Sequence, residues 1–204
     1  MTMPMRRLLA CSLVAVFVSA QPAFAQADAG ERHGFAGAFG VGISSAGISC
    51  APQCTVDRQS GPSYMLRVGG HATEQFVIGL EATVFRADVK TMSPPGKWSL
   101  SFLSLVGLWY PTSDDDFFIK VGAGVATTKV DVSFKNVTSI QLTATDVGGK
   151  VGIGKDFRFA DRLALTAFAE AMFTPRSQAL SGGSNSGAKM SADLIHVGLA
   201  VAIP

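Results

Sequence analysis

Apolar residues alternate with small or polar residues along most of the chain from residue 34 onward. In the stretch Asp116–Ala126, every second residue from Phe117 to Val125 is apolar, and the positions between them hold Lys120 among small residues. Side chains alternate across a β-strand, so this pattern predicts a strand with one apolar face and one small or polar face. A charge among glycines is unusual for the solvent-facing side of a soluble sheet.

Eight stretches with this alternation predict eight strands. They are Gly34–Ser44, Ser63–Gly70, Gln75–Arg86, Lys97–Tyr110, Asp116–Phe134, Ile140–Asp156, Arg162–Phe173 and Asp193–Ile203. Most are close to the length of about 9–11 residues with which a tilted strand crosses a bilayer. The expected connections are long at 45–62, 87–96 and 174–192, and short at 71–74, 111–115 and 157–161; the connection 135–139 fits this alternation least well. Short turns at one end and longer loops at the other are typical of outer-membrane barrels.

The strand at 97–110 is apolar on both faces, so alternation alone leaves its orientation open. The favoured orientation places one set of apolar residues outward: Leu100, Phe102, Val106, Leu108 and Tyr110. Aromatic residues lie near the ends of several predicted strands, which suits interfacial girdles. These residues are Tyr64, Phe85, Trp98, Trp109, Tyr110, Phe117 and Phe173.

Composition decides between two barrel types. Charged residues make up only 16% of the chain, hydrophobic residues 48%, and there are 22 glycines. A soluble eight-stranded barrel would place its apolar face inside. Here the other face is mostly glycine and alanine with single charges, which suits a narrow lumen better than a solvated surface. We therefore predict an all-β fold, an eight-stranded antiparallel up-and-down transmembrane β-barrel, closed because an open edge in lipid would leave backbone groups unpaired.

The first 25 residues have the layout of a signal peptide. Arg6 and Arg7 precede the apolar run Leu8–Ser19, and Ala23-Phe24-Ala25 resembles a cleavage site. We expect export and cleavage after Ala25, a polar leader at 26–33 and a barrel domain at 34–204. Without Arg6 and Arg7, 15 of the 17 basic residues remain against 15 acidic ones, which disfavours a nucleic-acid partner.

The predicted strands resemble the small eight-stranded outer-membrane barrels, the superfamily that includes the OmpA transmembrane domain and OmpX-like proteins. The stretches that carry this resemblance are Phe76–Phe85, Leu105–Pro111, Phe117–Val125 and Val197–Ile203. It implies a monomer in the outer membrane of a Gram-negative cell, in contact with membrane lipids and lipopolysaccharide and inserted by the barrel assembly machinery. The final Ile203-Pro204 departs from the aromatic residue with which such barrels usually end.

Six charged residues fall on the inward faces of the predicted strands. They are Arg67, Glu81, Lys120, Asp146, Lys150 and Glu170. An eight-stranded barrel leaves an interior barely wide enough for side chains, and an unpaired buried charge costs several kcal/mol. We therefore expect an ion-pair network that plugs the lumen; the alternatives are an ion path or a catalytic cluster.

The histidines offer little support for an enzyme. The lipid A deacylase branch of this architecture uses a His-x-Ser pair. None of His33, His71 and His196 has a serine two residues later, and their spacing fits no metal site. His196 is expected to point inward as a hydrogen-bonded core residue. We predict no catalytic residue, metal site or cofactor.

Cys50 and Cys54 lie in the first long connection, in the sequence Cys-Ala-Pro-Gln-Cys. Export into an oxidising compartment favours a local disulfide between them. A metal or redox site at this spacing is the alternative, but partner ligands and a helix N-terminus are missing.

The last long connection, Ser177–Lys189, is rich in glycine and serine and is predicted to form a flexible exposed hairpin tip. Such a loop could contact a surface ligand, although most such loops are only solvated. The pattern therefore favours a barrel with a plugged lumen and a structural or surface-interaction role through its outer loops. The alternatives are a narrow channel for small solutes and, with less support, a lipid A-modifying enzyme.

Overall fold

The computed structural model describes residues 34–51, 54–89, 96–112, 116–134, 137–160, 162–175, 177–181 and 184–203. The predicted signal peptide, the polar leader and His33 lie outside these residues. Among the residues described, no helix is long and apolar enough to cross a membrane.

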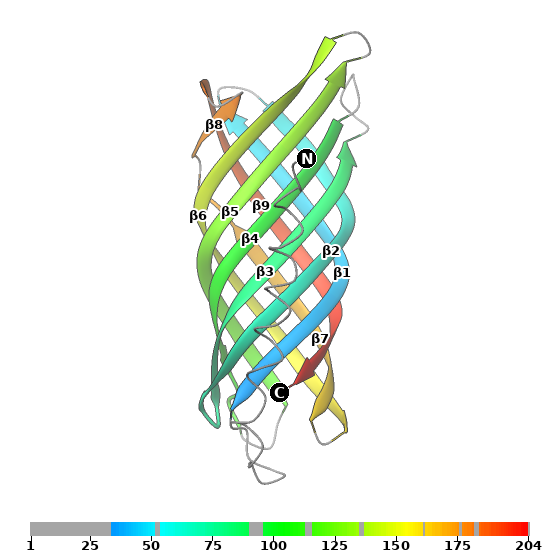
Figure 1. The fold of residues 1–204 in the computed structure, drawn as a ribbon, viewed down its shortest axis with the longest axis vertical. Coiled ribbons are helices and arrows are strands. Elements are labelled where there is room, and N and C mark those ends of the chain that lie inside the picture. Colours follow the sequence, from blue (N-terminus) through cyan, green and yellow to red (C-terminus); the bar gives the residue numbers. More distant parts are fainter. Residues whose placement is uncertain are drawn as a thin grey trace, which may run out of the picture.

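The strands form one closed antiparallel ring (Figure 1). They are β1 (Phe35–Ala51), β2 (Cys54–Thr73), β3 (Phe76–Val89), β4 (Gly96–Trp109), β5 (Phe117–Phe134), β6 (Val137–Ala160), β7 (Leu163–Phe173), β8 (Ser177–Ser181) and β9 (Ser184–Ile203). Each strand from β1 to β6 pairs with the next, and β1 pairs with β9 to close the ring. Strands β7 and β8 both pair with β6 and β9, so together they fill one of eight places. The predicted fold class is confirmed.

The apolar faces of the strands point outward, and the small and charged faces point into the lumen. Ile43 and Val147 are 71% and 70% exposed, whereas Glu81 and Lys120 are 0% and 1% exposed. A belt of lipid surrounds a membrane barrel, so its outer wall needs apolar side chains in the same way as a soluble core does. This inverted arrangement confirms that the alternation describes a transmembrane barrel.

Most of the connections predicted as long loops are continuations of strands. Strands β1 and β2 run through residues 45–62 almost to the tip of their hairpin, and β5 and β6 likewise leave only residues 135–136 between them. The predicted loop Ser177–Lys189 contains β8 and the beginning of β9. The prediction of loops was wrong here because the outward face beyond the apolar belt also carries polar or small residues, such as Ser45 and Ser49. The period-2 contrast is therefore weak there, although the backbone groups still pair.

The predicted orientation of the strand at 97–110 was also wrong. Leu100, Phe102, Val106, Leu108 and Tyr110 are buried in the lumen, whereas Leu103 and Leu105 are 58% and 59% exposed on the outer wall. Residues directly opposite each other on paired strands share a face. Ser104 lies opposite Glu81 and Leu105 opposite Leu80, so the neighbouring strand β3 decides which face of β4 is wet.

Three of the aromatic residues expected in girdles are inside the barrel instead. Phe85, Trp98 and Tyr110 are 1–2% exposed, and the rings of Phe85 and Trp98 make an edge-to-face contact with centroids 5.2 Å apart. Tyr64, Trp109 and Phe173 do point outward. Proximity to a strand end therefore places an aromatic residue at the right level but leaves its face undetermined.

Candidate functional site

A cluster of charged side chains crosses the middle of the lumen. Its members come from six strands: Arg67 on β2, Glu81 on β3, Lys120 on β5, Lys150 on β6, Glu170 on β7 and His196 on β9. Their exposed fractions lie between 0% and 5%. We call these six residues the lumen cluster.

Glu81 is the carboxylate with the most partners. Both of its oxygens accept hydrogen bonds from Lys120 Nζ over 3.0 Å, and Oε1 also accepts one from Lys150 Nζ over 2.6 Å. Arg67, directly opposite on β2, brings an Nη1 atom to 3.8 Å from Oε2. Glu81 therefore ties together β2, β3, β5 and β6 across the lumen.

Glu170 holds the other half of the cluster. One of its oxygens forms an ion pair with Lys120, and Oε1 lies 3.8 Å from Lys150 Nζ and 3.0 Å from His196 Nδ1. Because an ionised carboxylate only accepts hydrogen bonds, Nδ1 of His196 carries the proton in this contact. Lys120 thus bridges the two carboxylates, and Lys150 contacts both of them.

The cluster contains one more cation than carboxylates if His196 is neutral, and aromatic rings partly offset this excess. The guanidinium of Arg67 lies 5.8 Å from the centre of the Phe118 ring, Lys120 Nζ 5.5 Å from that of Phe168, and Lys150 Nζ 5.2 Å from that of Phe102. The face of an aromatic ring attracts a cation, most strongly where water is excluded. Lys150 also donates a hydrogen bond to Thr83 Oγ1 over 3.1 Å.

Glycines beside the cluster leave space for its long side chains. A Cβ atom on Gly152 would lie 2.8 Å from Cβ of Glu170, and one on Gly42 would lie 2.7 Å from Nε2 of His196. On Gly122, it would meet Cγ of Lys150 at 3.0 Å. These distances are shorter than normal contacts between carbon atoms, so larger residues at these positions would displace the cluster.

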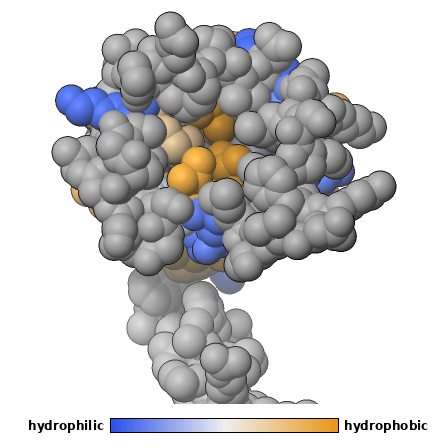
Figure 2. Space-filling model, turned by 90° about the horizontal axis from the view of Figure 1, so that it is seen from above, coloured by the Kyte–Doolittle hydropathy of each residue, from blue (hydrophilic) through white to orange (hydrophobic). Residues whose placement is uncertain are grey.

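Apolar layers cover the lumen cluster toward both ends of the barrel. The layer at the hairpin end includes Ile48, Phe85, Trp98, Leu100 and Met190. Figure 2 looks into this end, and hydrophobic side chains occupy the centre of the opening. Two smaller apolar groups cover the cluster toward the short turns; they contain Ala36, Val77, Val106, Leu108, Tyr110 and Phe118, and Ala38, Met65, Phe168, Ala200 and Ala202.

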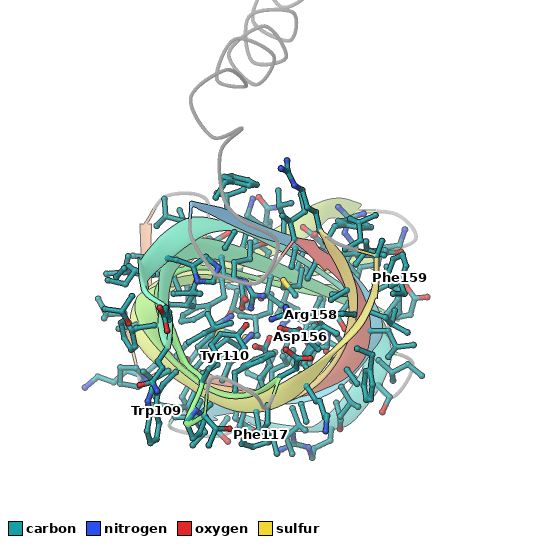
Figure 3. The ribbon with its side chains drawn as sticks, turned by 90° about the horizontal axis from the view of Figure 1, so that it is seen from below. Trp109, Tyr110, Phe117, Asp156, Arg158 and Phe159 are labelled. Carbon is teal, nitrogen blue, oxygen red and sulfur yellow. The ribbon has the colours of Figure 1, made fainter. Side chains whose placement is uncertain are left out.

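A second polar group, which the sequence reasoning did not identify, lies at the end with the short turns. Asp156 is 2% exposed and accepts hydrogen bonds from Tyr110 Oη over 3.0 Å and from Thr166 Oγ1 over 2.5 Å. Figure 3 shows Tyr110 and Asp156 inside the ring, with Trp109, Phe117 and Phe159 on its outside. Asp156 is six residues from Lys150 on β6, so the period-2 pattern already predicted that its side chain points into the lumen.

The structure brings together five of the six charged residues predicted in the lumen. The sixth, Asp146, is half-buried and lies four residues from Lys150 on the same face of β6. His196 joins the cluster, whereas His71 lies near the end of β2. Among the described residues, no three His, Cys, Asp or Glu side chains are grouped as metal ligands.

Cys50 and Cys54 are directly opposite each other in the pairing of β1 with β2. Their side chains lie outside the described part of the structure, so the disulfide stays a prediction. The pairing places the two residues in adjacent strands at the tip of one hairpin.

The fold defines a β-barrel of the outer-membrane class, and comparison with known proteins identifies the family. Residues 10–201 match the model of the outer membrane protein beta-barrel domain, and the chain belongs to this family. The family resemblance predicted above is therefore confirmed, and so is the location in the outer membrane. No curated protein sequence matches the chain significantly.

Solved structures of several outer-membrane proteins are similar to the barrel. Neisserial surface protein A is 12% identical, with a TM-score of 0.55 over 83% of this chain and 96% of that one. Ail of Yersinia pestis, solved with the heparin analogue sucrose octasulfate, is 10% identical, with a TM-score of 0.50 over 81% and 98%. OprG of Pseudomonas aeruginosa is 14% identical, with a TM-score of 0.50 over 85% and 98%. At these identities the likeness shows the fold alone.

Proposed function

We propose that this protein is a closed outer-membrane barrel that acts as a structural or surface-contact protein, and that its lumen is not a transport path. The observation that supports this most directly is the lumen cluster, in which Lys120 joins Glu81 on β3 to Glu170 on β7 across the interior. Apolar layers lie above and below it. A solute passing through would have to separate buried ion pairs, which costs several kcal/mol for each charge left alone.

The hairpins at one end supply the surface for contacts. Outer-membrane barrels have short turns on the periplasmic side and longer connections outside the cell. The β1–β2 and β5–β6 hairpins extend at the same end, opposite the short turns that follow Thr73, Trp109 and Ala160. This end therefore corresponds to the cell exterior, where the extended hairpins are available to a surface ligand.

An enzymatic role has weaker support. Glu170 and His196 form the acidic and basic members of a possible triad, and Ser44 lies opposite His196 on β1. However, neither Ser44 Oγ nor His196 Nε2 has a hydrogen-bond partner within the described part of the chain, and the contact from nucleophile to base is missing there. All three residues are buried in the lumen, away from lipid and solvent.

The channel alternative is tested by recording from the refolded protein in planar lipid bilayers. The closed barrel should show no stepwise conductance above the leak of the bilayer. The variant Glu81→Lys places a third amine beside Lys120 and Lys150, and we expect it to conduct because the cluster then repels itself. Stepwise conductance of the unmodified protein, comparable to that of Glu81→Lys, would contradict a closed lumen.

The surface role is tested in cells that carry single cysteines. Ser184→Cys in a background without Cys50 and Cys54 should react with a membrane-impermeant maleimide on intact cells. Arg162→Cys, in the turn after β6, is the matched control and should react only after the outer membrane is permeabilised. A screen of a deletion strain for lost adhesion or altered envelope integrity then separates the contact role from the structural role.

A further inference from the structure

The outer wall of β3, β4, β5 and β6 carries an ordered set of polar rows just beyond its apolar belt. The last apolar row consists of Ala82, Leu103, Val125 and Val147, which lie opposite one another across the four strands. The next row in the direction of the hairpins holds Val84 on β3 and hydroxyl residues on the other three strands, namely Ser101, Thr127 and Thr145. The hydroxyls of Thr127 and Thr145 are 3.4 Å apart.

Cations occupy the row beyond these hydroxyls. Arg86 lies opposite Ser99, Ser99 opposite Lys129, and Lys129 opposite Thr143. Adjacent strands are about 4.8 Å apart, so the backbones at Arg86 and Lys129 are about 10 Å apart with one small side chain between them. The long side chains at both positions can therefore reach the same anion above Ser99.

Among the described residues, Arg86 and Lys129 have no acidic partner. Arg86 and Lys129 are exposed and make no ion pair there, whereas Arg58 on β2 is paired with Asp193. In the outermost row, Lys97 lies between Asp88 and Asp131, and Asp131 accepts a hydrogen bond from Gln141 over 2.8 Å. The acidic residues are thus one row further from the membrane than Arg86 and Lys129.

The level of this row matches the outer surface of the membrane. Trp109 marks the opposite interface on β4 and is ten residues from Ser99 along the same strand. At about 3.3 Å per residue and a strand tilt of about 40°, this separation corresponds to about 25 Å along the membrane normal, the height of the apolar band of such barrels. Arg86 and Lys129 therefore lie at the headgroups of the outer leaflet.

We propose that Arg86 and Lys129, with the hydroxyl of Ser99 between them, bind a phosphate group of the phosphorylated glycolipid in the outer leaflet. The acyl chains of that lipid would lie along Leu103 and Val125, which continue the same face below the row of hydroxyl residues. Arginine and lysine at an interface bind phosphate through charge-assisted hydrogen bonds, and a neighbouring hydroxyl adds a further donor. The proposal concerns the outer wall and is independent of whether the lumen is closed.

The test measures binding of bisphosphorylated lipid A to the protein refolded in detergent, by native mass spectrometry over a concentration series. The double variant Arg86→Gln/Lys129→Gln should bind at least about tenfold more weakly, the effect of losing charged hydrogen bonds. The matched control is Lys155→Gln/Arg162→Gln, which removes two exposed cations at the other end. It should bind like the unmodified protein. Heat-dependent migration on gels verifies that all three proteins are folded.

Two further probes identify the group that is recognised. Dephosphorylated lipid A should bind the unmodified protein as weakly as bisphosphorylated lipid A binds the double variant. Inorganic phosphate at the same concentration should not displace bisphosphorylated lipid A. Equal binding by the double variant, equal binding of dephosphorylated lipid A, or displacement by inorganic phosphate would each overturn the proposal. Conductance of the double variant should remain that of the unmodified protein, which separates this test from that of the closed lumen.

Discussion

Lys120 Nζ donates hydrogen bonds to both carboxylate oxygens of Glu81 over 3.0 Å, while it also forms an ion pair with Glu170. These three side chains come from β5, β3 and β7, so a single ammonium group connects strands that do not pair with one another. Backbone hydrogen bonds join neighbouring strands of the barrel wall, and this contact joins strands across the interior.

Replacing Lys120 with Met should strongly destabilise the barrel. The substitution leaves Glu81 and Glu170 close together without the ammonium between them, and breaking a buried ion pair from one side costs about 3–5 kcal/mol. We expect a lower urea midpoint for unfolding from lipid vesicles. The control Lys155→Met removes an exposed ammonium from β6 and should change the free energy of unfolding by less than about 0.5 kcal/mol. Equal midpoints for the two variants would contradict the bridging role.

The orientation of β4 can be measured with nitroxide labels at two neighbouring positions. A label at Leu105→Cys should lie in the bilayer and collide often with dissolved oxygen, because Leu105 is exposed on the outer wall. A label at Val106→Cys starts inside the lumen, next to Leu108 and Phe118, and should be shielded. Both labels are placed in a background without Cys50 and Cys54. Higher oxygen accessibility at position 106 than at position 105 would reverse the assigned faces.

Removing the hydroxyl of Tyr110 should weaken the end of the barrel with the short turns. Tyr110→Phe takes one of two hydroxyl donors from the buried carboxylate of Asp156, and a hydrogen bond to a charged group contributes about 1.5–3 kcal/mol. We expect a loss of that order in the free energy of unfolding. Tyr64→Phe is the matched control, because Tyr64 is exposed on the outer wall. If both variants unfold alike, the contact between Tyr110 and Asp156 contributes nothing measurable.

Cys50 and Cys54 should form a disulfide in the exported protein. They lie opposite each other on adjacent strands, and cells export such hairpins into an oxidising compartment. Protein purified without reductant should therefore take up no maleimide at these positions, and should take up two groups after reduction. The closed loop is short, so reduction should change the stability of the barrel little. Labelling of both cysteines before reduction would show that they are free thiols.

The alternation of apolar and polar residues was sufficient to predict a strand and its orientation where one face of the strand is lipid-exposed and the other is not. In β5, Ile119 and Val121 alternate with Lys120 and Gly122, and this contrast of apolar and polar positions indicates both the strand and its orientation. The same reasoning identified the charges of the lumen cluster, because charges on the inward face of a narrow barrel must find partners. Their partners were not predictable, since Lys120 and Glu170 lie on strands that are not neighbours.

By itself, the sequence determined that this chain forms a transmembrane barrel, because period-2 alternation, glycine content and few charges are properties of the residues themselves. Only the tertiary structure decided the orientation of β4 and the length of the hairpins. In β4 both faces are apolar, so its orientation depends on Glu81 across the pair with β3. In residues 45–51 the outward face holds Ser45, Gly47 and Ser49, and Ile48 is the only large apolar residue inside, so the alternation is too short to predict the backbone pairing that extends the strands. Ring closure likewise brings Lys120 to Glu170, since only the curvature of the wall makes distant strands face each other.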